Sequence, residues 1–310
     1  MSDAVNRIAD RIRKLEVQGA RNVAISALEA VKCLAEETKA ANREGFLDEL
    51  YLARDALFCS RETEPLMRNA LRLVLSQVEH SEENEVCNLS IIVSSAANEF
   101  LKDLELSKER IAEIGSRRIK DDMVVLTHCH SSTVTNLLGR AKKEGKTFEV
   151  ICTETRPAFQ GRITAKEMLE LGIKTTFIVD SAARAFISQA DIVLVGADAM
   201  TSEGNVVNKI GTSTIAVLAH EAKKPFYVVS ELLKFDPETL RGEYEKIEER
   251  AASEIWQNAP KGLTIRNPAF DVTSRDLIHG IICEEGILSP HLLLEVVRRV
   301  YPWIFEKPSG

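Results

Sequence analysis

The strongest constraint on the fold is a change of pattern after Gly115. From there on, short apolar runs rich in β-branched residues alternate with helix-like segments, each long enough to hold one crossover helix. This alternation is typical of parallel βαβ units. The sequence therefore predicts an α/β fold with a Rossmann-like, doubly wound parallel sheet. The expected strands are Met123–Leu126, Phe148–Cys152, Thr175–Val179, Asp191–Val195 and Phe226–Val229.

The N-terminal third has a different pattern. Val5, Ile8, Ile12 and Leu15 recur at helical spacing, and the same spacing returns between residues 89 and 104. No strand pattern interrupts these segments. The sequence therefore predicts a helical bundle in a domain 1–115, followed by the Rossmann-like α/β domain 116–310.

Charge and hydropathy exclude several classes of partner. The 310 residues carry a formal net charge of -7 and a pI near 5.6, which argues against a nonspecific nucleic-acid or anionic-membrane surface but leaves room for a local basic pocket. The charged amphipathic start lacks the apolar core of a signal peptide, and no apolar run approaches the roughly 20 residues that span a bilayer. We therefore expect a cytoplasmic protein without membrane or nucleic-acid partners.

The six cysteines are scattered and form no C-x-x-C pair. This pattern suits reduced thiols in a cytosol better than disulfides or structural zinc. We expect neither a metal site nor a cofactor.

Ligands of open α/β sheets bind outside the carboxyl ends of the strands, so reactive residues just after a strand are site candidates. Cys129 follows the first expected strand, and Ser131 and Ser132 open a helix whose free amides favour an anion. A buried cysteine beside two helix-capping serines explains the segment equally well. If strand geometry continues, His128 and His130 both point away from the thiol, and neither is predicted to bind metal.

Two further candidates follow later strands. Asp198 comes directly after a run that should be buried on both faces, although most aspartates at such positions cap turns. Asn208 and Lys209 precede a Gly-Thr pair and a new helix, which is the arrangement of a phosphate clamp, although a solvated loop lysine is the commoner outcome. A thiol, a carboxylate and phosphate donors at adjacent strand ends fit proton transfer on a sugar phosphate.

These segments carry a resemblance to a known family. The chain resembles the archaeal ribose-1,5-bisphosphate isomerases, which are related to methylthioribose-1-phosphate isomerases and to the regulatory alpha, beta and delta subunits of the eukaryotic translation initiation exchange factor. The resemblance covers nearly the whole chain. Its densest motifs are Leu126–Ser131, Thr153–Pro157, Gln160–Gly161, Val179–Ala182, Gly196–Asp198, Asn208–Thr212 and Asn267–Thr273.

The resemblance implies an aldose-to-ketose isomerisation of a sugar that carries phosphate on C1. Cys129 would protonate the ring oxygen, and Asp198 would take the 2-hydroxyl proton while hydride moves from C2 to C1. This scheme requires a protonated thiol: a helix N-terminus lowers a thiol pKa, whereas an apolar closed pocket and bound phosphate raise it. The resemblance also implies phosphate ligands in the helical domain, namely Gly19, Ala20 and Arg61.

Two cations typical of the enzymes are replaced here. Gln18 stands where they have arginine before Gly-Ala, and Ser132 stands where they have lysine. Each charge-assisted phosphate contact contributes roughly 1.5 to 3 kcal/mol, so two losses would weaken bisphosphate binding unless Arg21, Arg162 or Arg184 substitutes. Arg21 is the nearest in sequence. Arg61 suits bidentate phosphate binding, and an ion pair with Glu62 or Glu64 is the second interpretation.

Three functions therefore stay open. The first is a ribose-1,5-bisphosphate isomerase of nucleotide salvage; the second is a non-catalytic, initiation-factor-like regulatory subunit that binds a nucleotide or sugar phosphate; the third is a methylthioribose-1-phosphate isomerase. The retained pair of Cys129 and Asp198 favours the first. The resemblance further implies a homo-oligomer, as a dimer or a hexamer, with a nucleotide such as AMP as an activator.

Overall fold

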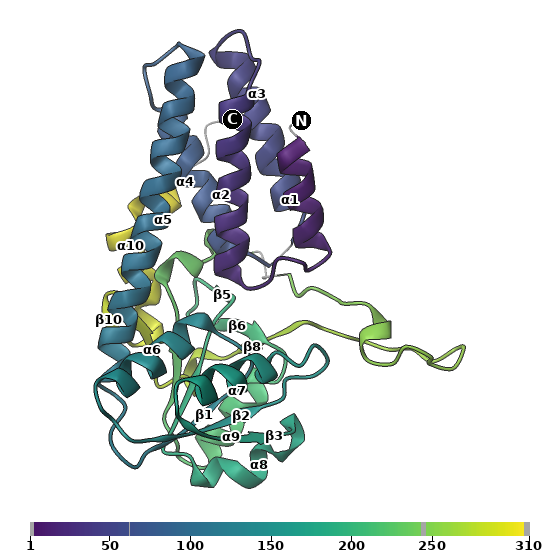
Figure 1. Cartoon of the computed structure of the whole chain (residues 1–310), viewed down its shortest axis with the longest axis vertical. Helices are drawn as coiled ribbons and strands as arrows, with labels where there is room; N and C mark the ends of the chain where they lie inside the picture. The colour runs from purple at the N-terminus through teal and green to yellow at the C-terminus, as the bar shows by residue number, and fades with distance from the viewer. Residues whose placement is uncertain (1–2, 62, 243–245, 307–310) are drawn as a thin grey trace. The chain divides into compact units, whose positions relative to one another are not determined.

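The computed structural model describes residues 3–61, 63–242 and 246–306, and it divides into two compact units (Figure 1). The first unit contains the chain up to Leu106, then Leu233–Pro237, and the C-terminal residues from Val297. The second contains Ser107–Leu232 and Glu238–Val296. The continuous domains 1–115 and 116–310 stay a prediction; in these units two later segments are grouped with the first helices, and between those segments the Phe305 ring lies 5.6 Å from that of Phe235.

The first unit is built from helices. They are α1 (Asp3–Arg13), α2 (Ala20–Glu37), α3 (Arg43–Phe58), α4 (Pro65–Glu79) and α5 (Val86–Ser116), whose residues from Ser107 onward belong to the second unit. Each of the first four helices buries one apolar stripe, and side chains such as Leu28, Phe46, Leu50, Met67 and Leu71 are almost completely inaccessible to solvent. The expected N-terminal helical bundle is confirmed.

The second unit is organised around a seven-stranded sheet of order β10-β9-β7-β4-β1-β2-β3. All neighbouring strands are parallel except β10 and β9. The strands are β1 (Val124–Thr127), β2 (Glu149–Thr153), β3 (Lys174–Ile178), β4 (Ile192–Val195), β7 (Phe226–Val229), β9 (Gly280–Cys283) and β10 (Gly286–Leu288). The predicted doubly wound parallel sheet is therefore confirmed, and its strand order reverses between β1 and β4, where such folds bind ligands.

Helices accompany this sheet. They are α6 (Ser132–Lys143), α7 (Gly161–Glu170), the short α8 (Ala183–Phe186), α9 (Thr212–Glu221) and α10 (Leu293–Val300). Val125, Leu137, Val150, Leu194 and Ile282 lie in one hydrophobic cluster of strand and helix side chains. This cluster fixes the strand ends from which the candidate site is built.

A second, three-stranded antiparallel sheet was not expected from the sequence. It joins β5 (Ala199–Met200), β6 (Val206–Lys209) and β8 (Phe270–Thr273) in the order β5-β6-β8. Asn208 pairs with Asp271 and Lys209 with Phe270, so both predicted phosphate donors lie on a strand rather than in a free loop.

No helix within the described ranges combines the length and the hydropathy that crossing a membrane requires.

Candidate active site

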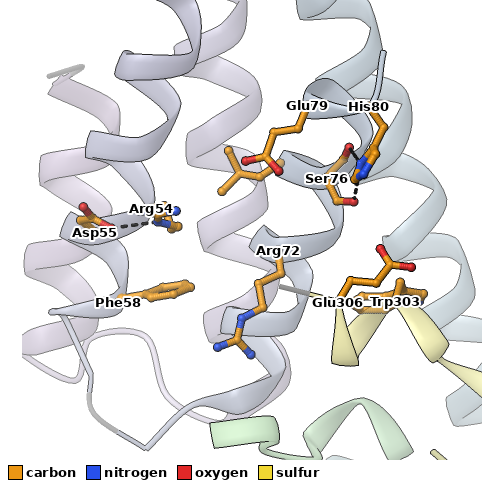
Figure 2. A pocket seen from close by; sticks show the side chains of 10 residues that line it. Arg54, Asp55, Phe58, Arg72, Ser76, Glu79, His80, Trp303 and Glu306 are labelled. Atoms are coloured by element: carbon orange, nitrogen blue, oxygen red, sulfur yellow. Dashed lines mark hydrogen bonds and ion pairs between the residues drawn. The ribbon is translucent and has the colours of Figure 1, made fainter. Parts of the chain in front are cut away.

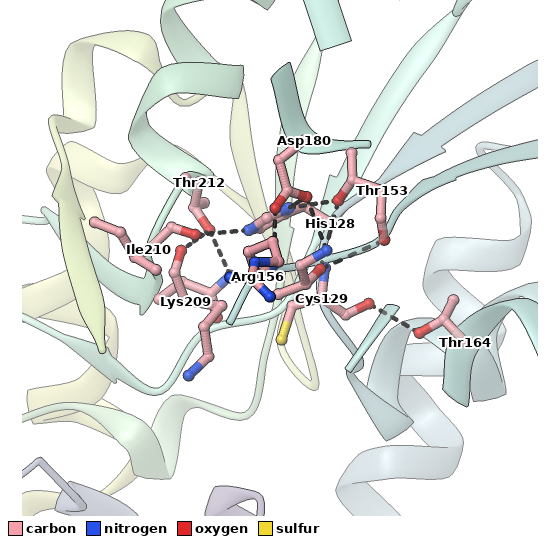
Figure 3. A network of polar contacts seen from close by, with 12 residues as sticks. His128, Cys129, Thr153, Arg156, Thr164, Asp180, Lys209, Ile210 and Thr212 are labelled. Atoms are coloured by element: carbon pink, nitrogen blue, oxygen red, sulfur yellow. Dashed lines mark hydrogen bonds and ion pairs between the residues drawn. The ribbon is translucent and has the colours of Figure 1, made fainter. Parts of the chain in front are cut away.

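The loop after β1 holds Cys129 in an uncommon backbone conformation. Its φ angle is 66°, in the left-handed region that non-glycine residues rarely adopt. Two threonines hold the loop there: the Cys129 amide donates to Thr155 Oγ1 at 2.9 Å, and Thr164 Oγ1 donates to the Cys129 carbonyl at 2.8 Å (Figure 3). Backbone strain of this kind persists only where the surroundings enforce it, and it is concentrated at functional sites.

His128, in the same loop, is buried, with 2% of its surface exposed. Its Nδ1 lies 2.6 Å from Thr153 Oγ1, and its Nε2 lies 2.9 Å from the Ile210 carbonyl oxygen (Figure 3). Burial lowers the pKa of His128, so the ring is neutral at pH 7. Both nitrogens of this neutral imidazole are therefore engaged by residues outside the loop.

Ser131 and Ser132 begin α6, as expected. Ser131 is the N-cap, and its hydroxyl accepts a bond from the Val134 amide at 3.4 Å. Gly196, at the end of β4, leaves room for this hydroxyl, since a Cβ there would lie 2.7 Å from Ser131 Oγ. Ser132 is exposed in the first turn of the helix. The N-terminus of α6 therefore lies at the switch point of the sheet.

Asp198 lies between the two sheets of the second unit. It is partly buried, and its amide donates to the Val207 carbonyl at 2.9 Å, which fixes the connection from β4 to β5. Its charge contributes to the pKa of the Cys129 thiol, so the carboxylate and the thiol lie within electrostatic reach of each other. The structure thus brings together the two residues expected to carry the chemistry.

Asn208 and Lys209 end β6, directly before the turn that leads into α9. Asn208 is buried and donates from Nδ2 to Thr212 Oγ1 at 2.9 Å, while Lys209 Nζ lies 4.8 Å from the centre of the Phe270 ring. Asp271 already accepts bonds from the Gly211 amide at 2.8 Å and from the Ser213 hydroxyl at 2.8 Å. This carboxylate already occupies the start of α9. The Lys209 ammonium is therefore a better hydrogen-bond donor to a phosphate than the amides of that helix.

The Cys129 thiol is strongly perturbed. Burial raises its pKa to about 12; the nearby Lys209 ammonium opposes this rise, and the Asp198 carboxylate adds to it. Burial is the largest of these influences on the pKa of Cys129. The thiol keeps its proton at neutral pH, which is the state that a general acid requires.

Several positioning residues were missed by sequence reasoning. Asp180, after β3, accepts bonds from the amides of Thr155 at 2.8 Å and Arg156 at 2.7 Å, and thereby shapes the loop that holds Cys129. Thr153, Thr155, Asp180 and Asp271 all lie in the quoted sequence motifs; the first three end or follow strands, whereas Asp271 lies within β8. Their position relative to the strands was the available signal.

The predicted phosphate ligands of the helical unit surround the start of α2. Gly19 is its N-cap with a φ of 82°, and Ala20 is its first residue. Gln18 donates from Nε2 to the Leu15 carbonyl at 3.0 Å. Arg21 donates to the Leu104 carbonyl at 3.0 Å and pairs with the Glu105 carboxylate.

Arg21 is thus already held by two acceptors within its own unit. The other two arginines expected to compensate also have partners: Arg184 pairs with Glu221 at 3.3 Å, and the Arg162 guanidinium stacks 3.8 Å from the centre of the Phe159 ring.

Arg61 forms an ion pair with Glu64, with Nη1 2.8 Å from Oε1. Its side chain is 9% exposed, and that of Glu64 is 0% exposed. This is one of the two partners in the second interpretation from the sequence; Glu62, the other, lies outside the described residues. A role of Arg61 in phosphate binding stays a prediction.

A cavity of about 290 Å³ lies in the helical unit, lined by residues that include Arg54, Phe58, Arg72, Glu79 and Trp303 (Figure 2). Its lining includes none of the predicted site residues. It combines two arginines with three carboxylates, from Asp55, Glu79 and Glu306. This mixture gives no net attraction for a phosphate, so the functional assignment rests on the strand ends of the second unit.

Comparison with known proteins identifies the family. The model of the initiation factor 2 subunit family matches residues 16–290. The chain belongs to this family.

Similar proteins include enzymes with the chemistry expected from the sequence. The chain is 43% identical over 300 residues to a ribose 1,5-bisphosphate isomerase of Archaeoglobus fulgidus, covering 95% of this chain and 93% of that protein. It is 39% identical over 309 residues to one of Thermococcus kodakarensis, covering 97% and 96%. A methylthioribose-1-phosphate isomerase of Pelotomaculum thermopropionicum is 35% identical, covering 91% and 82%.

The fold is shared with a solved member of the family. The structure of a translation initiation factor eIF-2B of Pyrococcus horikoshii superimposes with a TM-score of 0.82 at 33% identity, covering 94% of this chain and 98% of that one. Because one family contains both enzymes and initiation-factor proteins, the fold alone does not assign an activity. The chemistry must be argued from the site.

Proposed function

We propose that this protein is an isomerase that converts ribose 1,5-bisphosphate to ribulose 1,5-bisphosphate. The observation that carries the proposal is the protonated Cys129 thiol at the switch point of the sheet, within electrostatic reach of Asp198 and Lys209. A chain that only bound a ligand would not need an acid and a base together. The relatives named above as isomerases support this assignment.

The roles of the residues follow from their chemistry. Cys129 gives its proton to the ring oxygen as the bond between that oxygen and C1 breaks. Hydride then moves with its electron pair from C2 to C1, and Asp198 takes the 2-hydroxyl proton as the C2 carbonyl forms. One proton enters the sugar and one leaves it, so the product is an isomer of the substrate.

Phosphate binding would come from several elements. Lys209 supplies charge, Asn208 lies beside it, and Ser131 and Ser132 open α6, whose N-terminus favours an anion. We propose that Gly19, Ala20 and Arg61 bind the second phosphate, as the resemblance implies, and that Gln18 and Arg21 beside them contribute to the same site. The domain division 1–115 and 116–310 is kept as the proposed functional division between these two groups of ligands.

The resemblance also leads us to propose a wider setting. The protein would act in nucleotide salvage in the cytoplasm as a homo-oligomer, and a nucleotide such as AMP would activate it. Turnover measured with and without AMP tests the last point, since an activator must raise the rate at subsaturating substrate.

The test of the main proposal is conversion of α-ribose 1,5-bisphosphate to ribulose 1,5-bisphosphate, followed by phosphorus NMR. We expect turnover by the wild type and none by Cys129→Ser or Asp198→Asn. Cys87→Ser, which changes an exposed thiol on α5, is the matched control and should retain full activity. Wild-type activity that persists in Cys129→Ser would exclude the thiol as the acid.

One observation favours a second substrate. Gln18 and Ser132 replace two cations, and Arg21 is held by Glu105 and Leu104, so fewer charges serve a second phosphate. A methylthioribose 1-phosphate, which carries one phosphate, would need fewer. Parallel assays with both sugars decide between them. Binding without turnover of either sugar would instead support a non-catalytic regulatory subunit.

A further inference from the structure

A continuous chain of polar contacts connects the candidate acid to the turn that follows Lys209. It runs from the Ile210 carbonyl to His128 Nε2 (2.9 Å), from His128 Nδ1 to Thr153 Oγ1 (2.6 Å), and on to Thr155 Oγ1 (3.5 Å) and the Cys129 amide (2.9 Å) (Figure 3). The chain joins the ends of β1 and β2 to the turn between β6 and α9.

The direction of each bond near His128 follows from its chemistry. A carbonyl oxygen can only accept, so Nε2 carries the proton and donates to Ile210. The buried ring is neutral, so Nδ1 carries no proton and accepts a hydrogen bond from the Thr153 hydroxyl. At the other end of the chain, the Cys129 amide donates to Thr155 Oγ1. One tautomer of His128 therefore satisfies both of its contacts.

The turn itself is fitted to this imidazole. Gly211, with a φ of 102°, lies so close that a Cβ at this position would be 3.1 Å from His128 Nε2. Asp271 holds the same turn from the opposite strand through the Gly211 amide. Lys209 precedes the turn, so a shift of His128 would be transmitted both to Cys129 and to the turn beside Lys209.

We infer that His128 is a positioning residue, which fixes the position of the acid thiol of Cys129 relative to the phosphate-binding Lys209. This inference rests on the proposed isomerase function. His128 is buried and is not assigned contact with the sugar. Its effect is exerted through the two bonds to Thr153 and Ile210, and displacement of a reacting group by about 1 Å can reduce a rate about 100-fold.

Substitutions can separate positioning from simple packing. His128→Ala removes both bonds, and we expect kcat to fall about 100-fold while KM changes less than about fivefold. His128→Gln retains an amide donor near the Nε2 position, and we expect it to recover at least about tenfold of the lost kcat. A merely structural role would not give this rescue together with a selective loss of kcat.

The Thr153 contact provides a second, independent test. Thr153→Val keeps the shape of the side chain but removes the hydroxyl, and we expect it to lower kcat about tenfold. The double variant with His128→Ala should be no slower than His128→Ala alone, because both changes break the same chain. His220→Gln, at an exposed histidine of α9, is the control and should leave kcat and KM unchanged.

A measurement that needs no turnover distinguishes failure of this inference from failure of the proposed function. We would measure the rate of alkylation of Cys129 by iodoacetamide at pH 8, resolved by peptide mass spectrometry. Release of the loop in His128→Ala should raise that rate at least about tenfold, with His128→Gln close to the wild type. This result would support the positioning role even if no sugar phosphate were isomerised.

The inference is overturned if folded His128→Ala matches the wild type in the alkylation of Cys129, or if all His128 and Thr153 effects are additive. If His128→Ala does not fold, His128→Gln and Thr153→Val decide alone. In that case, a Thr153→Val variant with the alkylation rate and kcat of the wild type would contradict the inference. A tenfold change in either quantity would support it.

Discussion

Cys129 combines a strained backbone with a thiol that resists ionisation. Its backbone has a φ of 66°, and its thiol is placed where ionisation is strongly disfavoured. Strain at a non-glycine residue costs on the order of 1 to 3 kcal/mol and is maintained here by the hydrogen bond that the Cys129 amide donates to Thr155 and the one that Thr164 donates to the Cys129 carbonyl. The consequence at this residue is a thiol that is directed by its loop and kept protonated, as a general acid should be.

The reactivity of this thiol is a direct prediction. With a pKa near 12 in place of 9.0, Cys129 has about a thousandfold less thiolate at pH 8 than an unperturbed cysteine. Peptide-resolved alkylation at pH 8 should therefore modify the exposed Cys59 and Cys87 well before Cys129. Alkylation of Cys129 as fast as that of these two residues would refute a protonated, protected acid.

Among single residues, the sequence predicted the reactive residues better than the residues that hold them in place. Cys129 and Asp198 could be selected because each directly follows an apolar strand run. The structural role of His128 could not, because the argument from alternation assumed that strand geometry continues. The strand ends at Thr127, and the left-handed Cys129 changes the course of the chain. His128 instead contacts Ile210, which is 82 residues away, and no local pattern reveals such a contact.

Whether a strand could be predicted from the sequence depended on its length and on how far apart in the sequence the paired segments lie. The central strands were found because strands buried on both faces appear as continuous apolar runs, and Phe226–Val229 was found to the residue. The small sheet was missed because β5 has only two residues and β6 ends in the polar pair Asn208 and Lys209. The pairing of β6 with β8 joins segments that are distant in the chain, and a local sequence pattern does not encode such a pairing.

The junction between β2 and α7 depends on one glycine. A Cβ on Gly161 would lie 1.8 Å from the Thr153 carbonyl oxygen, so Gly161→Ala must displace the backbone of β2 or α7. We expect a loss of at least about 2 kcal/mol in the free energy of unfolding, together with loss of isomerase activity, because Thr153 and Thr155 support Cys129. Urea denaturation and the phosphorus NMR assay measure the two effects.

Gly45→Ala is the matched control for that substitution. Gly45 lies in α3, and its added Cβ would meet no atom closer than 3.4 Å. Alanine has the higher helix propensity, so we expect stability to stay unchanged or to rise by up to about 1 kcal/mol. An equal loss of stability in both variants would contradict the steric explanation at Gly161.

For the molecule as a whole, three thiols with raised pKa values should make folding sensitive to alkali. Burial raises the pKa of Cys129 and Cys283 to about 12 and that of Cys152 to about 11, all from 9.0. Above pH 9 the unfolded chain loses these protons while the folded chain keeps them, so stability is complete below pH 9 and declines as pH rises. Each thiol contributes a slope of up to about 1.4 kcal/mol per pH unit.

Urea unfolding between pH 9.5 and 10.5 measures that slope. Cys283→Ser should reduce it, because a serine hydroxyl does not ionise in this range, whereas Cys87→Ser changes an exposed thiol and should leave it unaltered. The comparison uses slopes, so the packing cost of the serine, which is independent of pH, cancels. Identical slopes in wild type and Cys283→Ser would exclude the buried thiol as a cause.

Self-association is the remaining property of the whole molecule, and residues 246–263 are where we expect it to be decided. Part of this segment projects from the α/β unit with little regular structure (Figure 1). It exposes large apolar side chains: Ile255 is 39%, Trp256 52% and Leu263 53% accessible. Clustered apolar exposure of this kind is typical of interaction sites, and the proposed homo-oligomer supplies the partner.

The double substitution Trp256→Ser and Leu263→Ser should therefore weaken self-association at least about tenfold. A buried interface tryptophan commonly contributes about 2 kcal/mol or more, and this energy corresponds to at least about a tenfold change in the dissociation constant. Sedimentation velocity across a range of concentrations measures the change. Leu52→Ser removes a side chain of similar exposure, 55%, from α3 and is the control. If the double variant sediments as the wild type does, copies of the chain associate through another surface, and the exposed tryptophan must serve a different contact.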